Sequence, residues 1–251
     1  QDLAVGVTET ITVTYSVTDS QGGVDATPSF DIVITGVNNA PVATFNAAQV
    51  ATEDGAVITS ALTATDADTG DILTFSLDDS TIAGLSLAVD TWSFDPSHAD
   101  YQALAAGETQ DVVVGYTVTD SESATGQNSF TITVTGINDN PVGTFTTQQD
   151  VDEGDPAING QLTSTDVDNG DTADFADTTG GVAGLNINQD GSFSFDPSDA
   201  IYDILDEGDI QTHNVTYTVT DGLGSSDNGT FDIVITGTND APVATYNAPQ
   251  T

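Results

Sequence analysis

One short segment occurs three times in the chain, and this repetition limits the fold more than any other feature. The copies occupy residues 35–42, 135–142 and 236–243, with the common form Thr-Gly-x-Asn-x-x-Pro-Val, so the spacing is 100 and then 101 residues. Each copy follows an alternating, strand-like run and ends in a proline, which cannot join the interior of a sheet. A constant period of this kind indicates repeated structural units. We therefore interpret the segment as a junction between repeats.

Other motifs recur at the same interval. They begin at Tyr15, Tyr116 and Tyr217 (Tyr-x-Val-x-Asp), at Phe94 and Phe195 (Phe-Asp-Pro-Ser), at Asp66 and Asp166 (Asp-x-Asp), and at Glu53 and Glu153. The period predicts four parts, which are the C-terminal part of a repeat (1–40), two full repeats (41–140 and 141–241) and the start of another (242–251). The partial repeat offers about two strands and no second sheet. We expect further chain or a neighbouring molecule to complete it.

Within each repeat, the hydrophobic pattern has the period of a strand. Apolar and aromatic residues occupy every second position in residues 11–17, 30–34, 73–77 and 185–187, with mostly polar residues in between, and Gly, Asp, Asn and Ser cluster between such runs. Period-two patterns indicate half-buried strands, and about seven short strands in roughly 100 residues are typical of a β-sandwich. Only residues 97–104 and 198–205 suggest a helical turn. The predicted fold class is all-β.

The charge of the chain is entirely one-sided, with 40 acidic residues, no Lys and no Arg, for a net charge of −40. No basic surface exists to bind nucleic acid, and an anionic membrane surface would repel the chain. Self-repulsion destabilises a compact state, and without Cys no disulfide can offset it. Bound metal is the one kind of cross-link left. Because Met is also absent and no apolar run is long enough to span a bilayer, we expect this chain to be part of a larger protein.

Two acidic loops have a pattern that suits a hard cation. Asp66 and Asp68, and likewise Asp166 and Asp168, alternate within a turn and are followed by Gly and a third Asp. Alternate carboxylates can point at one ion, and Ca²⁺ takes six to eight oxygen ligands. The loops resemble an EF-hand in part, but its bidentate Glu is missing at the twelfth position, so the EF-hand interpretation is weak. The alternative is an Asp-rich turn that satisfies only its own backbone.

The order of these motifs resembles that of known repeat families. Glu53, Asp66-Ala67-Asp68, Tyr116-x-Val118-x-Asp120 and Asn138-Asp139-Asn140-Pro141 together resemble a cadherin repeat. Phe195-Asp196-Pro197 and the run from Tyr217 to Val243 are more similar to the bacterial VCBS repeat. The resemblance covers essentially the whole chain. It implies tandem cadherin-like (Ig-like) Greek-key β-sandwich domains, strung along large secreted, RTX-type adhesins of Gram-negative bacteria.

The cadherin resemblance also implies which residues bind Ca²⁺ at each junction. For the junction at 136–141 these are Glu53, Glu108, Asn138, Asp139, Asn140, Asp166, Asp168 and Asp221. For the junction at 36–41 they are Asn38, Asn39, Asp66, Asp68 and Asp120. For the junction at 237–242 they are Glu153, Asp209, Asn239 and Asp240. The first junction has Asn39 where the others have an Asp, so it carries less charge.

These observations predict a non-enzymatic, extracellular structural protein whose repeats are rigidified by calcium and hold a distal domain away from a surface. Its partners are calcium ions and neighbouring repeats, of the same chain or of identical chains, and neither nucleic acid nor a membrane. One alternative is a subunit of a self-assembling filament or sheath, in which a neighbouring chain completes the partial repeat. Another is a module that binds sugar or ice, although the sequence shows no regular Thr array or aromatic platform. An enzyme is disfavoured because every distinctive residue recurs as scaffold.

Overall fold

The structure is a computed structural model that describes residues 3–242 and residue 244. It divides into two units, the first formed by residues 1–102 and 107–136 and the second by residues 103–106 and 137 onward. Every regular element in the described residues is a β-strand, which confirms the predicted all-β fold class. No helix in this part of the chain could cross a membrane.

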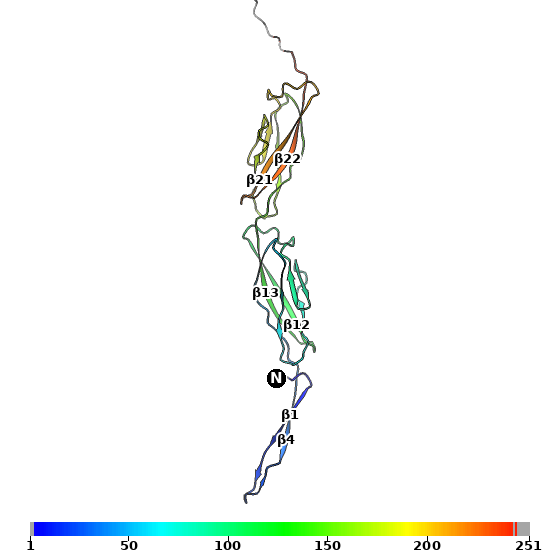
Figure 1. The fold of residues 1–251 in the computed structure, drawn as a ribbon, viewed down its shortest axis with the longest axis vertical. Coiled ribbons are helices and arrows are strands. Elements are labelled where there is room, and N and C mark those ends of the chain that lie inside the picture. The colour runs from blue at the N-terminus through cyan, green and yellow to red at the C-terminus, as the bar shows by residue number, and fades with distance from the viewer. Residues whose placement is uncertain (1–2, 243, 245–251) are drawn as a thin grey trace, which may run out of the picture. The chain divides into compact units, whose positions relative to one another are not determined.

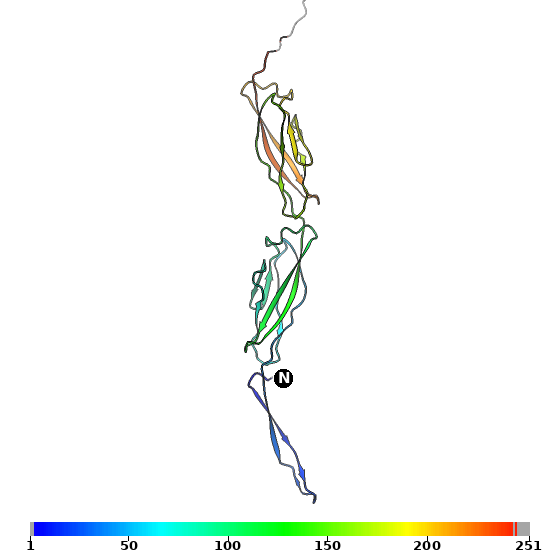
Figure 2. The same ribbon diagram turned by 180° about the vertical axis from the view of Figure 1, so that it is seen from behind.

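The first unit begins with a long hairpin, followed by a sandwich. The hairpin strands are β1 (Thr8–Thr14), β2 (Val17–Thr18), β3 (Val24–Asp25) and β4 (Ser29–Thr35). The sandwich strands are β5 (Val42–Ala43), β6 (Gln49–Thr52), β7 (Ile58–Ala61), β8 (Ala64–Thr65), β9 (Thr74–Leu77), β10 (Leu85–Ala88), β11 (Thr91–Phe94), β12 (Thr109–Thr119) and β13 (Thr125–Thr135). One sheet has the order β6-β13-β12-β9 and the other β10-β11-β7, with β5 paired to β8. The long antiparallel pair β12–β13 can be followed from both sides in Figures 1 and 2.

The second unit has the same topology. Its strands are β14 (Val142–Gly143), β15 (Gln149–Asp152), β16 (Ile158–Gln161), β17 (Ser164–Thr165), β18 (Asp174–Asp177), β19 (Leu185–Ile187), β20 (Ser192–Phe195), β21 (Ile210–Thr220) and β22 (Ser226–Thr236). The sheets have the orders β15-β22-β21-β18 and β16-β20-β19. In both units the first strand of the larger sheet pairs in parallel with the last one, β6 with β13 and β15 with β22. The repeat in the sequence is thus a repeat of the fold.

The core of each sandwich lies between its two sheets, where the alternating apolar residues point inward. In the first unit, the rings of Phe45 and Trp92 each lie 5.0 Å from the ring of Phe130. Trp92 is fully buried, so the one Trp of the chain belongs to the core rather than to a sugar-stacking surface. In the second unit, Phe193 stands in place of Trp92 and packs 5.2 Å from Phe231. Aromatic packing at these separations stabilises the sandwich beyond simple burial.

The β1–β4 hairpin presents the same alternating residues, and within residues 3–242 no second sheet covers them. Phe30 is 52% exposed, whereas its equivalent Phe130 is 2% exposed. Tyr15, Val17 and Ile32 are likewise 44% exposed or more. The alternation therefore predicts strands correctly here, but burial depends on a covering layer that these strands do not have.

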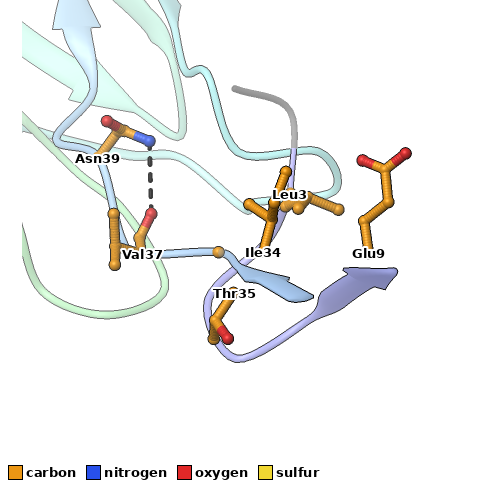
Figure 3. A pocket seen from close by; sticks show the side chains of 7 residues that line it. Leu3, Glu9, Ile34, Thr35, Val37 and Asn39 are labelled. Carbon is orange, nitrogen blue, oxygen red and sulfur yellow. Dashed lines mark hydrogen bonds between the residues drawn. The ribbon is translucent and has the colours of Figure 1, made fainter. Parts of the chain in front are cut away.

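A hollow of about 390 Å³ lies beside the end of β4 (Figure 3). It is lined by Leu3, Glu9, Ile34, Thr35, Gly36, Val37 and Asn39. In the complete repeats, the carbonyl oxygens of Thr135 and Thr236 at the equivalent strand end accept hydrogen bonds from the backbone of Glu53 and Glu153. Among the described residues of the hairpin, no strand pairs with β4 in this way.

The two segments expected to form a helical turn, residues 97–104 and 198–205, contain no helix. They are successive tight turns, in which the N–H of Tyr101 donates to the carbonyl of His98 and that of Tyr202 donates to the carbonyl of Asp199. Each Tyr is buried, and its hydroxyl donates to a carbonyl, of Ala83 and Ala183 respectively. The ring in the core fixes the turn, and the segment is too short to continue as a helix.

Candidate metal centre

Each unit gathers acidic side chains at the end where the preceding linker enters. In the first unit, Asp66 and Asp68 directly follow β8, Asp71 precedes β9, and Asp120 directly follows β12. The second unit repeats the arrangement after β17 and β21, with Asp166, Asp168, Asp171 and Asp221. We call these sets, together with the linker residues that bind to them, the first and second acidic clusters. Strand ends that meet at one edge of the sandwich are what bring the carboxylates together.

The linker residues of the first cluster are tied to its carboxylates. Asn38 donates from Nδ2 to Oδ2 of Asp120 at 3.0 Å. The backbone N–H of Asn39 donates to Oδ2 of Asp68 at 2.6 Å, and its side-chain amide donates to Oδ1 of the same residue at 3.3 Å. Asp66 in turn accepts from the backbone of Asp68 at 2.9 Å. The Asp-x-Asp turn thus caps itself in part, and of its carboxylate oxygens Asp66 Oδ2 has no hydrogen-bond partner.

The second cluster repeats most of these contacts. Nδ2 of Asn138 donates to Oδ2 of Asp221 at 2.7 Å and lies 2.9 Å from the hydroxyl oxygen of Ser225. The backbone N–H of Asp139 donates to Oδ2 of Asp168 at 2.8 Å. The other oxygen of Asp221 accepts from the backbone of the following turn, residues 223–225. In both units the linker is therefore bound to the domain that follows it.

Several buried oxygens in the clusters have no hydrogen-bond partner. In the first cluster they are Asn38 Oδ1, Asp66 Oδ2 and Asp71 Oδ2. In the second they are Asn138 Oδ1, Asp166 Oδ2, Asp168 Oδ1 and Asp171 Oδ2. A buried carboxylate oxygen without a partner is costly. In a chain without Lys or Arg, a cation could satisfy such groups.

Like charges lie close together inside the clusters. Ligand oxygens of Asp66, Asp71 and Asp120 lie within 4.8 Å of one another, as do those of Asp166, Asp168 and Asp171. Burial raises the pKa of Asp171, and the neighbouring charges of Asp166, Asp221 and Asp168 raise it further. These carboxylates repel one another, and a bound cation would relieve that repulsion.

Hydrogen bonds have the opposite effect on the carboxylates that end the long strands. Burial alone would raise the pKa of Asp221, but the hydrogen bonds from Asn138 and from the backbone of the following turn bring it below the ordinary value. Asp120 behaves in the same way, with Asn38 as its side-chain donor. In both groups the hydrogen bonds favour the ionised form of the carboxyl group.

The chemistry of the donors fits Ca²⁺. All donor side chains are carboxylates or carboxamides, and hard oxygen ligands of this kind suit calcium or magnesium rather than zinc or copper. In the first unit, Asn38, Asn39, Asp66, Asp68 and Asp120 meet as the sequence predicts. In the second unit, Asn138, Asp139, Asp166, Asp168 and Asp221 do so.

The other predicted ligands are surface residues or lie near the end of a domain. Asn140, Glu108, Asp209, Asn239 and Asp240 are exposed. Glu53 is fully buried in the first unit, and Glu153 is 5% exposed in the second. Oε1 of Glu153 accepts a 2.7 Å hydrogen bond from the backbone of Thr238, at the start of the next linker. The participation of these residues in cation binding stays a prediction.

The sequence reasoning did not select Asp71, Asp171 or Ser225. Asp71 and Asp171 recur at the 100-residue interval in the same run as each Asp-x-Asp pair, so the repeat itself was the signal that could have identified them. Ser225 has Ala124 at the equivalent position and gives no repeat signal. Only the fold brings its hydroxyl to Asn138.

Part of the chain matches a known protein-family model. Residues 138–234 match the family model of the bacterial Ig domain. This match covers the second unit from its linker almost to the end of β22. A search of curated proteins finds no match to the chain.

Solved cadherin ectodomains have the same fold. Domains EC22–24 of mouse cadherin-23 align with a TM-score of 0.52 and 17% identity over 91% of this chain and 74% of that chain. Domains EC21–23 of human CDH23 give 0.54 and 18% over 89% and 73%, and EC1–3 of mouse protocadherin-24 give 0.50 and 15% over 91% and 80%. At this level of identity the similarity shows the fold alone, which is that of tandem cadherin-like domains.

Proposed function

We propose that the chain is a set of extracellular extender repeats, rigidified by Ca²⁺, from a bacterial adhesin or surface protein of the VCBS type. The observation that carries this proposal is the set of buried, unpartnered oxygens at the linker end of each unit in a chain of net charge −40. The bacterial Ig match and the cadherin-like fold support it.

The mechanism would be electrostatic. Without a cation, the clustered carboxylates repel one another, and the linker is attached to the following domain by hydrogen bonds alone. Ca²⁺ bound by Asp66, Asp71, Asp120 and Asn38, and by their equivalents in the second unit, would neutralise this charge and fix the linker. Restricted linkers keep a chain of domains extended. In the high calcium found outside cells, even weak sites of extracellular modules are filled.

The test compares thermal unfolding and small-angle scattering in calcium and in chelator. At about 10 mM Ca²⁺, a site with a Kd of about 0.1 mM adds about 2.7 kcal/mol to the free energy of unfolding. Sodium chloride at matched ionic strength controls for simple screening of the −40 charge, and Mg²⁺ tests the choice of metal. An equal melting temperature and an equal maximum dimension in calcium and in chelator would contradict the proposal.

A second candidate function is favoured by one specific observation, the apolar face of the β1–β4 hairpin. Tyr15 and Phe30 are about half exposed, yet their equivalents Tyr116 and Phe130 are core residues. A neighbouring copy that covers this face would make the chain a filament or sheath subunit. Sedimentation at increasing protein concentration tests this directly. A constant monomeric mass would exclude self-assembly, and growth into fibres would support it.

A further inference from the structure

The two acidic clusters share four equivalent carboxylates. These are Asp66, Asp68, Asp71 and Asp120 in the first and Asp166, Asp168, Asp171 and Asp221 in the second. The linker residue that contacts them is Asn39 in the first cluster and Asp139 in the second. The oxygens of one equivalent pair, Asp68 and Asp168, are used differently.

In the first cluster, both oxygens of Asp68 are engaged by one residue. The backbone N–H of Asn39 donates to Oδ2 and its side-chain amide donates to Oδ1. Asp68 is not among the residues whose oxygens converge, which are Asp66, Asp71 and Asp120.

In the second cluster, the equivalent carboxylate keeps one oxygen free. Asp139 has no side-chain amide, so only its backbone N–H donates to Oδ2 of Asp168. Oδ1 of Asp168 is buried and has no hydrogen-bond partner, in a residue that is only 5% exposed. Here Asp168 does belong to the convergent set, with Asp166 and Asp171.

We propose that Asp168 is a direct cation ligand, whereas its equivalent Asp68 only positions the linker, and that the residue at position 39 or 139 decides between these roles. This inference rests on the proposed calcium-binding function. The repeats are then unequal in ligand set although their motifs are the same.

Hydrogen–deuterium exchange of the intact chain during a calcium titration measures calcium binding at each site separately. Peptides that cover residues 66–71 and 166–171 report the calcium concentration for half-maximal protection of each loop. Because ligand charge sets calcium affinity, Asp168→Asn should raise that concentration for its own loop on the order of 10-fold, and Asp68→Asn by less than about 3-fold. Melting in chelator verifies that each variant is folded.

Exchanging the linker residues provides the matched test. Asp139→Asn supplies an amide donor to Asp168 and should weaken the second site about 10-fold, as expected for a residue that orients a ligand. Asn39→Asp removes the donor from Asp68, so that Asp68→Asn in this background should weaken the first site as Asp168→Asn does the second. Equal effects of Asp68→Asn and Asp168→Asn in the otherwise unchanged chain would overturn the inference. That result would leave calcium binding itself intact, whereas a wild-type chain whose two loops ignore calcium would refute the proposed function.

Discussion

The hydroxyl group of Tyr116 lies 3.0 Å from the carbonyl oxygen of Phe45 and 2.9 Å from its amide nitrogen. The hydroxyl donates to the carbonyl and accepts from the N–H. Tyr217 forms the same pair with Phe145, at 3.1 Å for both contacts. The ring is fully buried in each case. This pair attaches the segment that follows the linker to the long β-hairpin, so it connects the linker end of each unit to its core.

Tyr116→Phe should therefore destabilise the first unit. Removing the hydroxyl leaves two backbone groups of Phe45 without their side-chain partner, and a loss of about 1–3 kcal/mol in the free energy of unfolding is expected. Denaturant melts followed by the fluorescence of Trp92 measure this effect. The matched control is Tyr15→Phe, because Tyr15 is 48% exposed in the hairpin. A loss at Tyr15 as large as that at Tyr116 would contradict the assignment of stability to this pair.

Truncation of equivalent phenylalanines should give very different results. Phe130 contacts Phe45 and Trp92 and is 2% exposed, so Phe130→Ala should cost about 3–5 kcal/mol. Phe30→Ala removes the equivalent ring from the hairpin, where it is 52% exposed, and should change the melting temperature little. Calorimetry of both variants checks the prediction. A large effect of Phe30→Ala in a monomeric sample would show that another layer covers the hairpin.

Asn138→Asp should make the second unit depend more strongly on calcium. The substitution removes the amide that donates to Asp221 and Ser225 and places a second negative charge beside Asp221. In chelator, we expect a loss of about 1–3 kcal/mol, and a smaller loss in calcium, because the cation offsets the added charge. Asn239→Asp is the matched control, since Asn239 is the equivalent residue and is exposed. An identical loss with and without calcium would contradict the role of Asn138 at a cation site.

His213 should make the second unit less stable as the pH falls. Burial lowers the pKa of His213 in the folded state, while in the unfolded chain it stays near its ordinary value of about 6.5. The unfolded state therefore binds the proton first. The stability contributed by neutral His213 is complete above about pH 6.5 and is lost as the pH falls toward the folded pKa.

His213→Val tests this prediction, because Val112 is the equivalent residue in the first unit. The difference in free energy of unfolding between the variant and the wild type should grow in favour of the variant between about pH 7.5 and pH 5.5. Melts at several pH values, in chelator, measure it. A difference that does not change with pH would show that His213 does not titrate between the folded and unfolded states.

The repetition of short motifs was sufficient to predict the repeated β-sandwich. Alternation at Phe130 and Ile132, at Tyr116 and Val118, and at the same positions 101 residues later determines which face of each strand is apolar. That pattern is local, so it can be read without knowing what packs on it. The turn at residues 97–104 was less clear, because its conformation depends on the burial of Tyr101 rather than on its neighbours in sequence.

The sequence by itself determined the strands, the interval of the repeat and the excess of carboxylates without any basic partner. These properties follow from local periodicity and composition. Only the tertiary structure decided which carboxylates converge, because Asp71, Asp120 and the linker asparagines come from separate strand ends that meet only in the folded sandwich. It also separated Asp68 from Asp168, two residues with the same motif. The physical reason is a single side-chain amide, that of Asn39, which reaches a carboxylate 29 residues away in one unit and has no counterpart in the other.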